Sequence, residues 1–121
     1  MPTAERVNLA EKLTLFDESF RPKIIGTMND YKLQLVKVKG EFVWHSHEET
    51  DDFSLVLNGQ LTIQLRDRNV ELTPGELFVV PRGVEHCPKA ENEAQVLLIE
   101  RTGTVNTGGA TNALTASEEW I

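Results

Sequence analysis

The chain has 121 residues, of which 40% are hydrophobic, and this suits one compact domain and argues against wholesale disorder. Its formal net charge of −7 would repel a polyanion such as DNA or an acidic membrane surface. The densest basic pairs, Lys37/Lys39 and Arg66/Arg68, are expected at outward positions on strands. We therefore expect no nucleic-acid partner.

The chain also lacks the features of membrane and secreted proteins. It contains no run of eighteen apolar residues that could form a membrane span. Glu5 and Glu11 stand where a secretory signal needs a basic start and an apolar stretch. Small secreted domains more often carry paired cysteines than a single one, and Cys87 is alone. These features predict a cytoplasmic protein without a membrane partner.

A short helix is predicted near the N-terminus. Residues 7–16 place apolar side chains at roughly helical spacing, and Asn8 is a candidate N-cap. Pro22 prevents the helix from continuing far. We expect one or two helical turns within an N-terminal arm formed by residues 1–22.

Residues 23–101 have the sequence pattern of an all-β barrel or sandwich. Apolar, β-branched runs alternate with turn signals roughly every eight to twelve residues. Asn29-Asp30 predicts a tight turn, and Asn58-Gly59 predicts a hairpin between the runs on either side of it. The expected strands are 23–28, 31–39, 52–57, 60–66, 70–73, 77–80 and 94–99.

The tail, residues 102–121, is rich in Gly, Thr and Asn and ends in two apolar residues, Trp120 and Ile121. We expect this end to pack on the barrel or on a second subunit. Together with the apolar runs 23–28 and 94–99, it offers surface that two subunits could bury, and sheet edges must be covered. The sequence therefore predicts a homodimer.

All three histidines of the chain stand where metal chemistry would need them. His45 and His47 are two residues apart, so in extended backbone both side chains leave the same face. An acidic run ending in Asp51 and Asp52 follows, and His86 lies at the start of a later strand. Imidazole and carboxylate together suit a divalent metal. The alternatives are hydrogen-bonded core histidines and a solvated acidic loop.

Two motifs favour the metal interpretation. Gly40, His45-x-His47, Asp52 and Gly59 resemble the first cupin motif, and Gly75, Pro81-x-Gly83 and His86 resemble the second. The resemblance implies a double-stranded β-helix, or jelly roll, with one metal ion near the middle of the barrel. The family's metal ligands fall on His45, His47, Asp52 and His86.

Three positions depart from the family pattern. Asp52 replaces the family's Glu and is one methylene shorter, so we keep its neighbour Asp51 as a second candidate for the carboxylate ligand. Ala90 stands where the second motif often ends in Asn, and Gly40 is one residue closer to His45 than is usual. Neither Gly40 nor Ala90 would be a ligand.

Three histidines and one carboxylate leave coordination positions open on an ion such as Fe, Mn, Ni, Co or Zn. Such an ion can polarise a carbonyl oxygen, activate water or bind dioxygen. The first hypothesis is a metal-dependent isomerase, lyase or dioxygenase that acts on a small oxygen-rich substrate. The second is a non-catalytic module that binds a small molecule or stores metal.

Other residues carry weaker signals. Tyr31, Glu76 and Glu85 are candidates for a general base, although no pattern singles them out. Cys87 follows His86 and Trp44 precedes His45, so strand alternation turns both side chains away from the metal. We expect Cys87 to be a packed thiol and Trp44 to belong to the core or an interface.

Overall fold

The computed structural model describes residues 5–108 and 114–121. Within these ranges the chain is almost entirely β, as predicted, and no helix is long and apolar enough to cross a membrane. Residues 1–4 of the predicted arm and 109–113 of the predicted tail lie outside the described residues. The elements are α1 (Leu9–Leu13), β1 (Lys23–Met28), β2 (Tyr31–Glu41), β3 (Asp52–Asn58), β4 (Leu61–Leu65), β5 (Asn69–Leu72), β6 (Leu77–Val80) and β7 (His86–Arg101).

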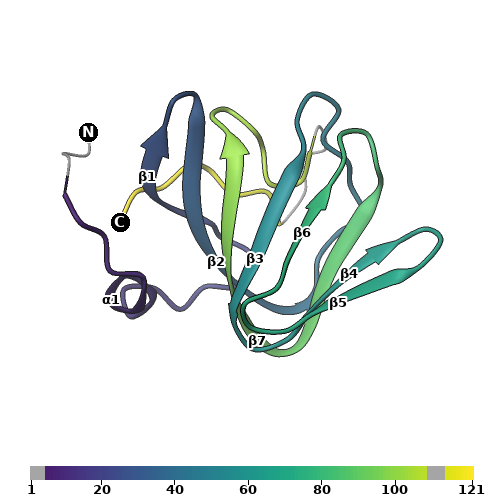
Figure 1. Cartoon of the computed structure of the whole chain (residues 1–121), viewed down its shortest axis with the longest axis horizontal. Coiled ribbons are helices and arrows are strands. Elements are labelled where there is room, and N and C mark those ends of the chain that lie inside the picture. Colours follow the sequence, from purple (N-terminus) through teal and green to yellow (C-terminus); the bar gives the residue numbers. More distant parts are fainter. Residues whose placement is uncertain (1–4, 109–113) are drawn as a thin grey trace.

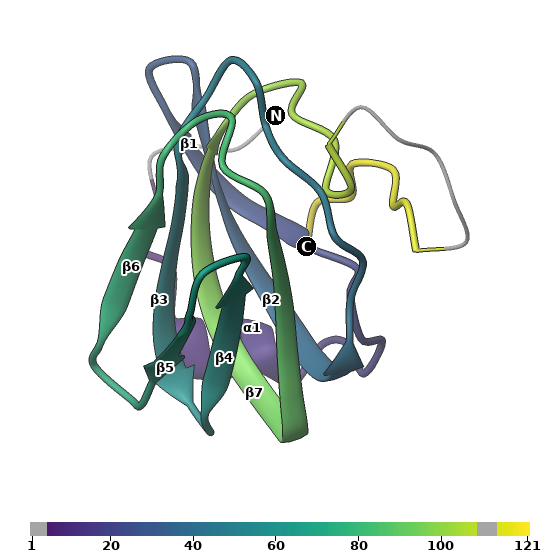
Figure 2. The ribbon, with the colours of Figure 1, turned by 90° about the vertical axis from the view of Figure 1, so that its right-hand side faces the viewer.

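The strands form an antiparallel jelly roll (Figure 1). The larger sheet has the order β1-β2-β7-β3-β6, and the β4–β5 hairpin faces it across the interior (Figure 2). Strand β7 belongs to both parts, because its second half lies between β2 and β3 while its first half pairs with β4. The barrel therefore closes around this one strand.

Strand β7 is much longer than the predicted strand 94–99. Pro88 and the polar residues Glu91 and Glu93 interrupt the apolar pattern, so alternation does not indicate a strand in the first half of β7. Pro88 is tolerated there because its carbonyl accepts a hydrogen bond from the Phe42 N–H at 2.9 Å while its missing N–H is not needed.

The predicted hairpin at Asn58-Gly59 is wrong. Both edges of β3 are occupied, by β6 on one side and β7 on the other, so β4 pairs with β5 and β7 instead. Gly59 has a φ of +81°, and a Cβ at this position would lie 2.6 Å from the carbonyl oxygen of Glu93. The Asn-Gly pair is a corner that packs tightly on β7 and carries the chain from one sheet to the other.

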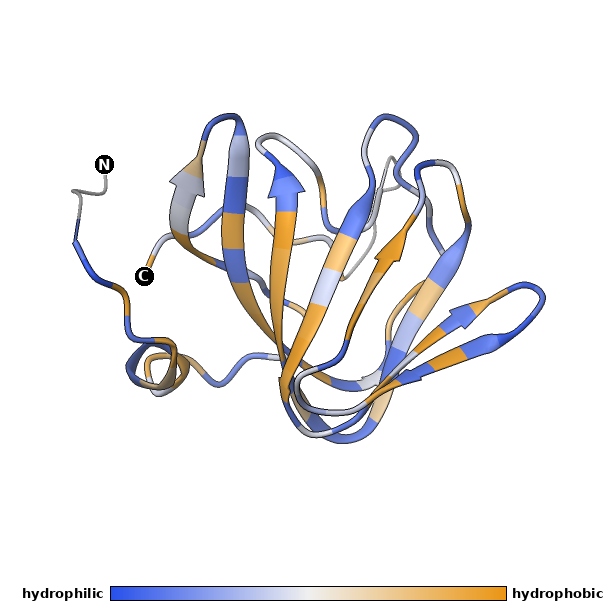
Figure 3. Ribbon diagram, viewed as in Figure 1, coloured by the Kyte–Doolittle hydropathy of each residue, from blue (hydrophilic) through white to orange (hydrophobic). Residues whose placement is uncertain are grey.

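Two apolar clusters stabilise the barrel. The larger one fills the interior with alternate residues of the strands, which are visible as orange bands in Figure 3. Burial of each of its larger side chains stabilises the fold by roughly 1.5–3 kcal/mol. The members of this cluster are Val36, Val38, Val56, Leu61, Ile63, Leu65, Leu72, Val80, Ala90, Ala94 and Val96.

The smaller cluster lies on the outer face of the sheet, where Leu13 of α1 and Phe16 of the segment that follows it pack on Ile25 and Leu35. As predicted, α1 begins after Asn8, whose side chain accepts a hydrogen bond from the Glu11 N–H at 3.0 Å. Lys37 lies under the same arm and is buried, not outward in solvent as we expected. Its Nζ donates to the carbonyl oxygens of Leu13 and Phe16 at 2.8 and 2.6 Å.

The C-terminal residues lie along β1 of the same chain. The Ile24 N–H donates to the Glu119 carbonyl at 2.7 Å, and the Ile121 N–H donates back to the Ile24 carbonyl at 3.2 Å. The Lys23 Nζ lies 2.7 Å from a carboxylate oxygen of Glu119, and the Lys12 Nζ donates to the Ile121 carbonyl at 2.8 Å. The end of the chain thus covers part of the free edge of β1.

Candidate metal centre

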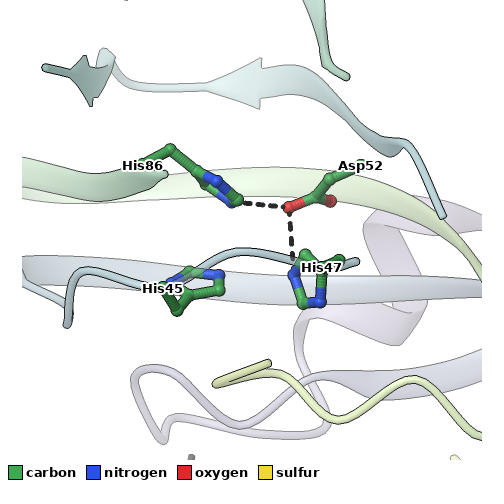
Figure 4. A group of neighbouring side chains, drawn as sticks. All are labelled: His45, His47, Asp52 and His86. Carbon is green, nitrogen blue, oxygen red and sulfur yellow. Dashed lines mark hydrogen bonds and ion pairs between the residues drawn. The ribbon is translucent and has the colours of Figure 1, made fainter. Parts of the chain in front are cut away.

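Four side chains converge inside the barrel (Figure 4). His45 and His47 come from the extended segment between β2 and β3, Asp52 opens β3, and His86 opens β7. Each offers one ligand atom, and these four atoms all lie within 4.8 Å of one another. The structure therefore brings together all four residues that the motifs selected.

Backbone hydrogen bonds hold the two histidine-bearing segments against each other. His45 and His86 form an antiparallel bridge in which each N–H donates to the other's carbonyl, at 3.0 and 2.9 Å. The His47 carbonyl accepts a further hydrogen bond from the Gly83 N–H at 2.9 Å. The turn that contains Gly83 is thereby fixed beside the histidine pair, which explains why the two motifs meet.

Two of the imidazoles are oriented by backbone carbonyls. The Nδ1 of His45 donates to the Val43 carbonyl, and the Nδ1 of His86 donates to the Val84 carbonyl, both at 2.9 Å. With a proton on Nδ1, Nε2 is the nitrogen that faces the cluster, and it can bind an ion once it carries no proton. Such outer hydrogen bonds are typical of histidines that bind metals.

The spacing of the carboxylate fits an ion held between these groups. The Oδ2 of Asp52 lies 3.0 Å from the Nε2 of His86 and 3.5 Å from the Nε2 of His47. Two ligand atoms that are each about 2.1 Å from a metal and at right angles to each other lie about 3.0 Å apart. The donor set and its distances therefore suit a divalent metal, for which the four residues would be the ligands.

Electrostatics favour the charged form of Asp52 and the neutral form of His45. Burial alone would raise the pKa of Asp52, but hydrogen bonds with His47 and His86 hold that pKa well below its ordinary value. Burial, with a smaller contribution from His86, lowers the pKa of His45 to about 4. A charged carboxylate and a neutral imidazole are the forms that coordinate a cation.

The second candidate carboxylate, Asp51, points elsewhere. Its Oδ1 accepts a hydrogen bond from the Arg82 N–H at 2.9 Å, and its side chain is 55% exposed. The side chain of Asp52, by contrast, is 14% exposed and reaches the histidines. Alternation at the start of β3 separates the two neighbours, so Asp52 is the carboxylate that faces the group.

A cavity of about 60 Å³ adjoins the group inside the barrel. Its walls are mostly apolar and include Phe20, Phe42 and Leu61. One acidic residue in the wall, Glu100, was missed from the sequence. The alternation of Val96, Leu98 and Glu100 along β7 could have revealed it, because the first two positions are inward.

Glu100 is 4% exposed, and burial raises its pKa to about 8. The negative charge of Asp52 contributes to this increase in pKa, while Lys32 opposes it. A carboxyl group in this environment is costly to ionise unless a cation or a hydrogen-bond donor lies near it.

The three candidates for a general base, Tyr31, Glu76 and Glu85, do not line this cavity. Glu76 accepts a hydrogen bond from the Thr73 N–H at 2.8 Å, and Glu85 lies 3.4 Å from Arg66 at the surface. Tyr31 is exposed beside the turn that joins β1 and β2. None of the three is placed to transfer a proton within the cavity.

Cys87 and Trp44, which adjoin histidines in the sequence, have structural roles. Cys87 is fully buried, as expected for a packed thiol, and burial raises its pKa to about 11, with Glu41 adding to the shift. Trp44 is half-buried and is neither a core residue nor part of the cavity. The guanidinium group of Arg66 stacks on its ring, 3.8 Å from the centroid.

The fold and this cluster agree with the family comparison. Residues 32–100 match the Cupin domain family. This chain belongs to the cupin family. The match covers both motifs and more than half of the chain, so the resemblance seen in the sequence is confirmed for the fold.

Three relatives illustrate the relationship. The crystal structure of a cupin-2 domain containing protein from Shewanella frigidimarina matches with a TM-score of 0.78 and 46% sequence identity. The match covers 78% of this cupin and 93% of that chain. Protein NMB1881 from Neisseria meningitidis is 31% identical, with a TM-score of 0.74, and covers 81% of this cupin and 100% of that chain. The YdbB protein of Bacillus subtilis is 32% identical over 77 residues, 63% of this cupin and 68% of YdbB.

The lowered pKa of His45 makes a prediction about the metal-free protein. Between about pH 6.5 and about pH 4 the unfolded chain binds a proton at this residue and the folded chain does not. The free energy of unfolding should therefore fall as the pH falls through this range, by up to about 3 kcal/mol from this residue. In a His45→Gln variant this part of the pH dependence should disappear. Urea unfolding in the presence of a chelator measures the free energy of unfolding at each pH. If it changes equally with pH in the wild-type protein and the His45→Gln variant, the lowered pKa of His45 is contradicted.

Proposed function

We propose that this cupin binds one divalent transition metal ion, Fe, Mn, Ni, Co or Zn, and acts on a small oxygen-rich substrate at the open coordination positions. The ligands are His45, His47, Asp52 and His86. The observation that carries the proposal is the convergence of these four side chains within 4.8 Å, beside a cavity in the barrel. When bound, such an ion supplies Lewis acidity toward a substrate oxygen.

The residues of the chain would position the substrate. The apolar walls exclude water, which strengthens electrostatic interactions at the site. Isomerase, lyase and dioxygenase chemistry all suit this arrangement. A cavity that encloses benzene measures about 150 Å³, more than twice the size of this one. The volume therefore favours a substrate of few atoms, or one end of a larger substrate, over an enclosed aromatic ring.

One observation supports a second candidate function. Tyr31, Glu76 and Glu85, the general-base candidates from the sequence, all lie outside the cavity wall. The cavity wall does contain Glu100. If that residue only binds a ligand, the protein would be a module that binds a small molecule or stores metal. The two functions differ in turnover, and the experiment below separates them.

We also propose that the protein acts in the cytoplasm as a homodimer. The single cysteine is consistent with a reducing compartment. On the outer face of the sheet, Leu77 and Val79 of the edge strand β6 are 53% and 41% exposed and pair with Leu55 and Phe53 of β3. An apolar edge of this kind is suited to burial against a second copy.

Metal content tests the ligand assignment. We expect close to one first-row divalent ion per chain in the wild-type protein, measured by elemental analysis after loading at neutral pH. Asp52→Ala should lower the metal affinity by at least about tenfold, because it removes a ligand from the group. Asp51→Ala is the matched control and should retain the metal, since Asp51 faces Arg82. Loss of metal from the Asp51 variant alone would reverse the assignment.

Turnover distinguishes the enzyme from the binding module. The metal-free protein is loaded with each of the five metals and given sugars, keto acids and catechols, with and without oxygen. We expect product from a small oxygenated compound with at least one metal. Product formed with several metals in the absence of oxygen would exclude a dioxygenase. Increases in the melting temperature without product under any condition would favour the binding module.

The homodimer is tested by light scattering at micromolar concentration, where we expect twice the mass of the chain. Val79→Lys places a charge on the apolar edge and should give a monomer of unchanged metal content. Val105→Lys is the matched control, because Val105 is similarly exposed but lies in the C-terminal segment. A wild-type monomer, or a Val79 variant that remains a dimer, would contradict this interface.

A further inference from the structure

A second polar group faces the cavity, at a different point from the four candidate ligands. Glu100 is 4% exposed and lines the same cavity as His45, His47 and Asp52. Its Oε2 is buried and has no hydrogen-bond partner among the described residues. An unpaired buried carboxyl oxygen is unfavourable, so it calls for a functional explanation.

The strand register sets Glu100 beside the metal group. Phe53 of β3 pairs with Ile99 of β7, and Asp52 and Glu100 are the next residue along each strand. Both side chains therefore project from neighbouring strands into the cavity. The four clustered ligand atoms belong to His45, His47, Asp52 and His86, so Glu100 lies beside the candidate ligands and is not one of them.

The neighbouring cation is engaged elsewhere. Lys32 of β2 pairs with Glu100 in the register, but its Nζ donates to the Thr104 carbonyl at 2.9 Å and to Glu118 at 3.3 Å. Gln34, also buried on β2, has an Oε1 that likewise lacks a partner within the described part of the chain. Gln34 and Glu100 line one small polar recess, where a ligand's hydrogen-bond donor would satisfy them.

The charges of the site favour a neutral ligand. A divalent ion would contribute +2 and Asp52 would contribute −1. Such a cation also favours the ionised form of Glu100, which would contribute a further −1 and bring the sum to zero in the metal-loaded site. Lys32 and Glu118 form an ion pair at 3.3 Å and cancel each other. An anionic ligand would add an uncompensated charge to a buried site, which is unfavourable.

We propose that Glu100 anchors a small, neutral α-hydroxy carbonyl compound, whose hydroxyl donates to the Oε2 of Glu100 while its carbonyl oxygen faces the His-Asp group. This inference deepens the proposed function and rests on it, because it assumes a metal at that group. A hydroxyl group can pair with the carboxyl in either protonation state. An α-keto acid of the same size has no hydroxyl to donate and brings a negative charge.

The test compares hydroxyacetone with pyruvate, which have the same carbon skeleton and differ in the hydroxyl and the carboxylate. Calorimetric titration of the metal-loaded protein gives the ratio of their dissociation constants. In the metal-loaded protein the cation favours the ionised form of Glu100. Glu100→Gln should therefore shift this ratio at least about tenfold in favour of pyruvate, because a hydrogen bond to a charged group is lost and a negative charge is removed. Glu91→Gln is the matched control on an exposed position of the same strand and should leave the ratio unchanged.

Metal content, measured on the same samples, distinguishes failure of the proposed function from failure of the role proposed for Glu100. A wild-type protein that takes up no metal would refute the proposed function. A wild-type protein that holds metal but fails to bind hydroxyacetone, or keeps its ratio in the Glu100→Gln variant, would refute the role of Glu100 alone. Glu100→Asp provides a second variant: it keeps the charge but withdraws the carboxylate, so it should weaken hydroxyacetone binding without a gain for pyruvate.

Discussion

The pairing of strand β7 with three other strands is the constraint on which the rest of this structure depends. Its second half lies between β2 and β3, and its first half holds the β4–β5 hairpin, so one continuous strand closes the barrel. The same strand begins with His86 and carries Glu100 near its end. The geometry of the candidate site thus follows from the backbone hydrogen bonds that form the fold.

The candidate metal centre is held in place by hydrogen bonds although two of its residues lie outside regular strands. The backbone bridge between His45 and His86 replaces the ladder of a sheet, and carbonyl oxygens fix the two rings. Burial then keeps His45 neutral, while histidine contacts keep Asp52 charged. These interactions prepare the group for a cation before it binds, which limits the reorganisation that binding requires.

The cavity combines an apolar wall with acidic groups that are expensive to bury. Asp52 is compensated by its histidine neighbours, whereas Glu100 depends on what occupies the cavity. A fold selected for stability alone would place an apolar residue at the position of Glu100, next to Val96 and Leu98. The acid is therefore better explained by recognition of a ligand than by stability of the barrel.

The sequence by itself determined the local features and the set of candidate ligands. Alternation of apolar residues indicated the strands, Asn8 marked the start of α1, and the motif spacing selected His45, His47, Asp52 and His86. Only the tertiary structure decided which strands pair: it turned Asn58-Gly59 into a corner and extended β7 through Pro88. It also buried Lys37 beneath α1 and placed Glu100 beside Asp52. These outcomes depend on contacts between distant segments, which local propensity and periodicity do not encode.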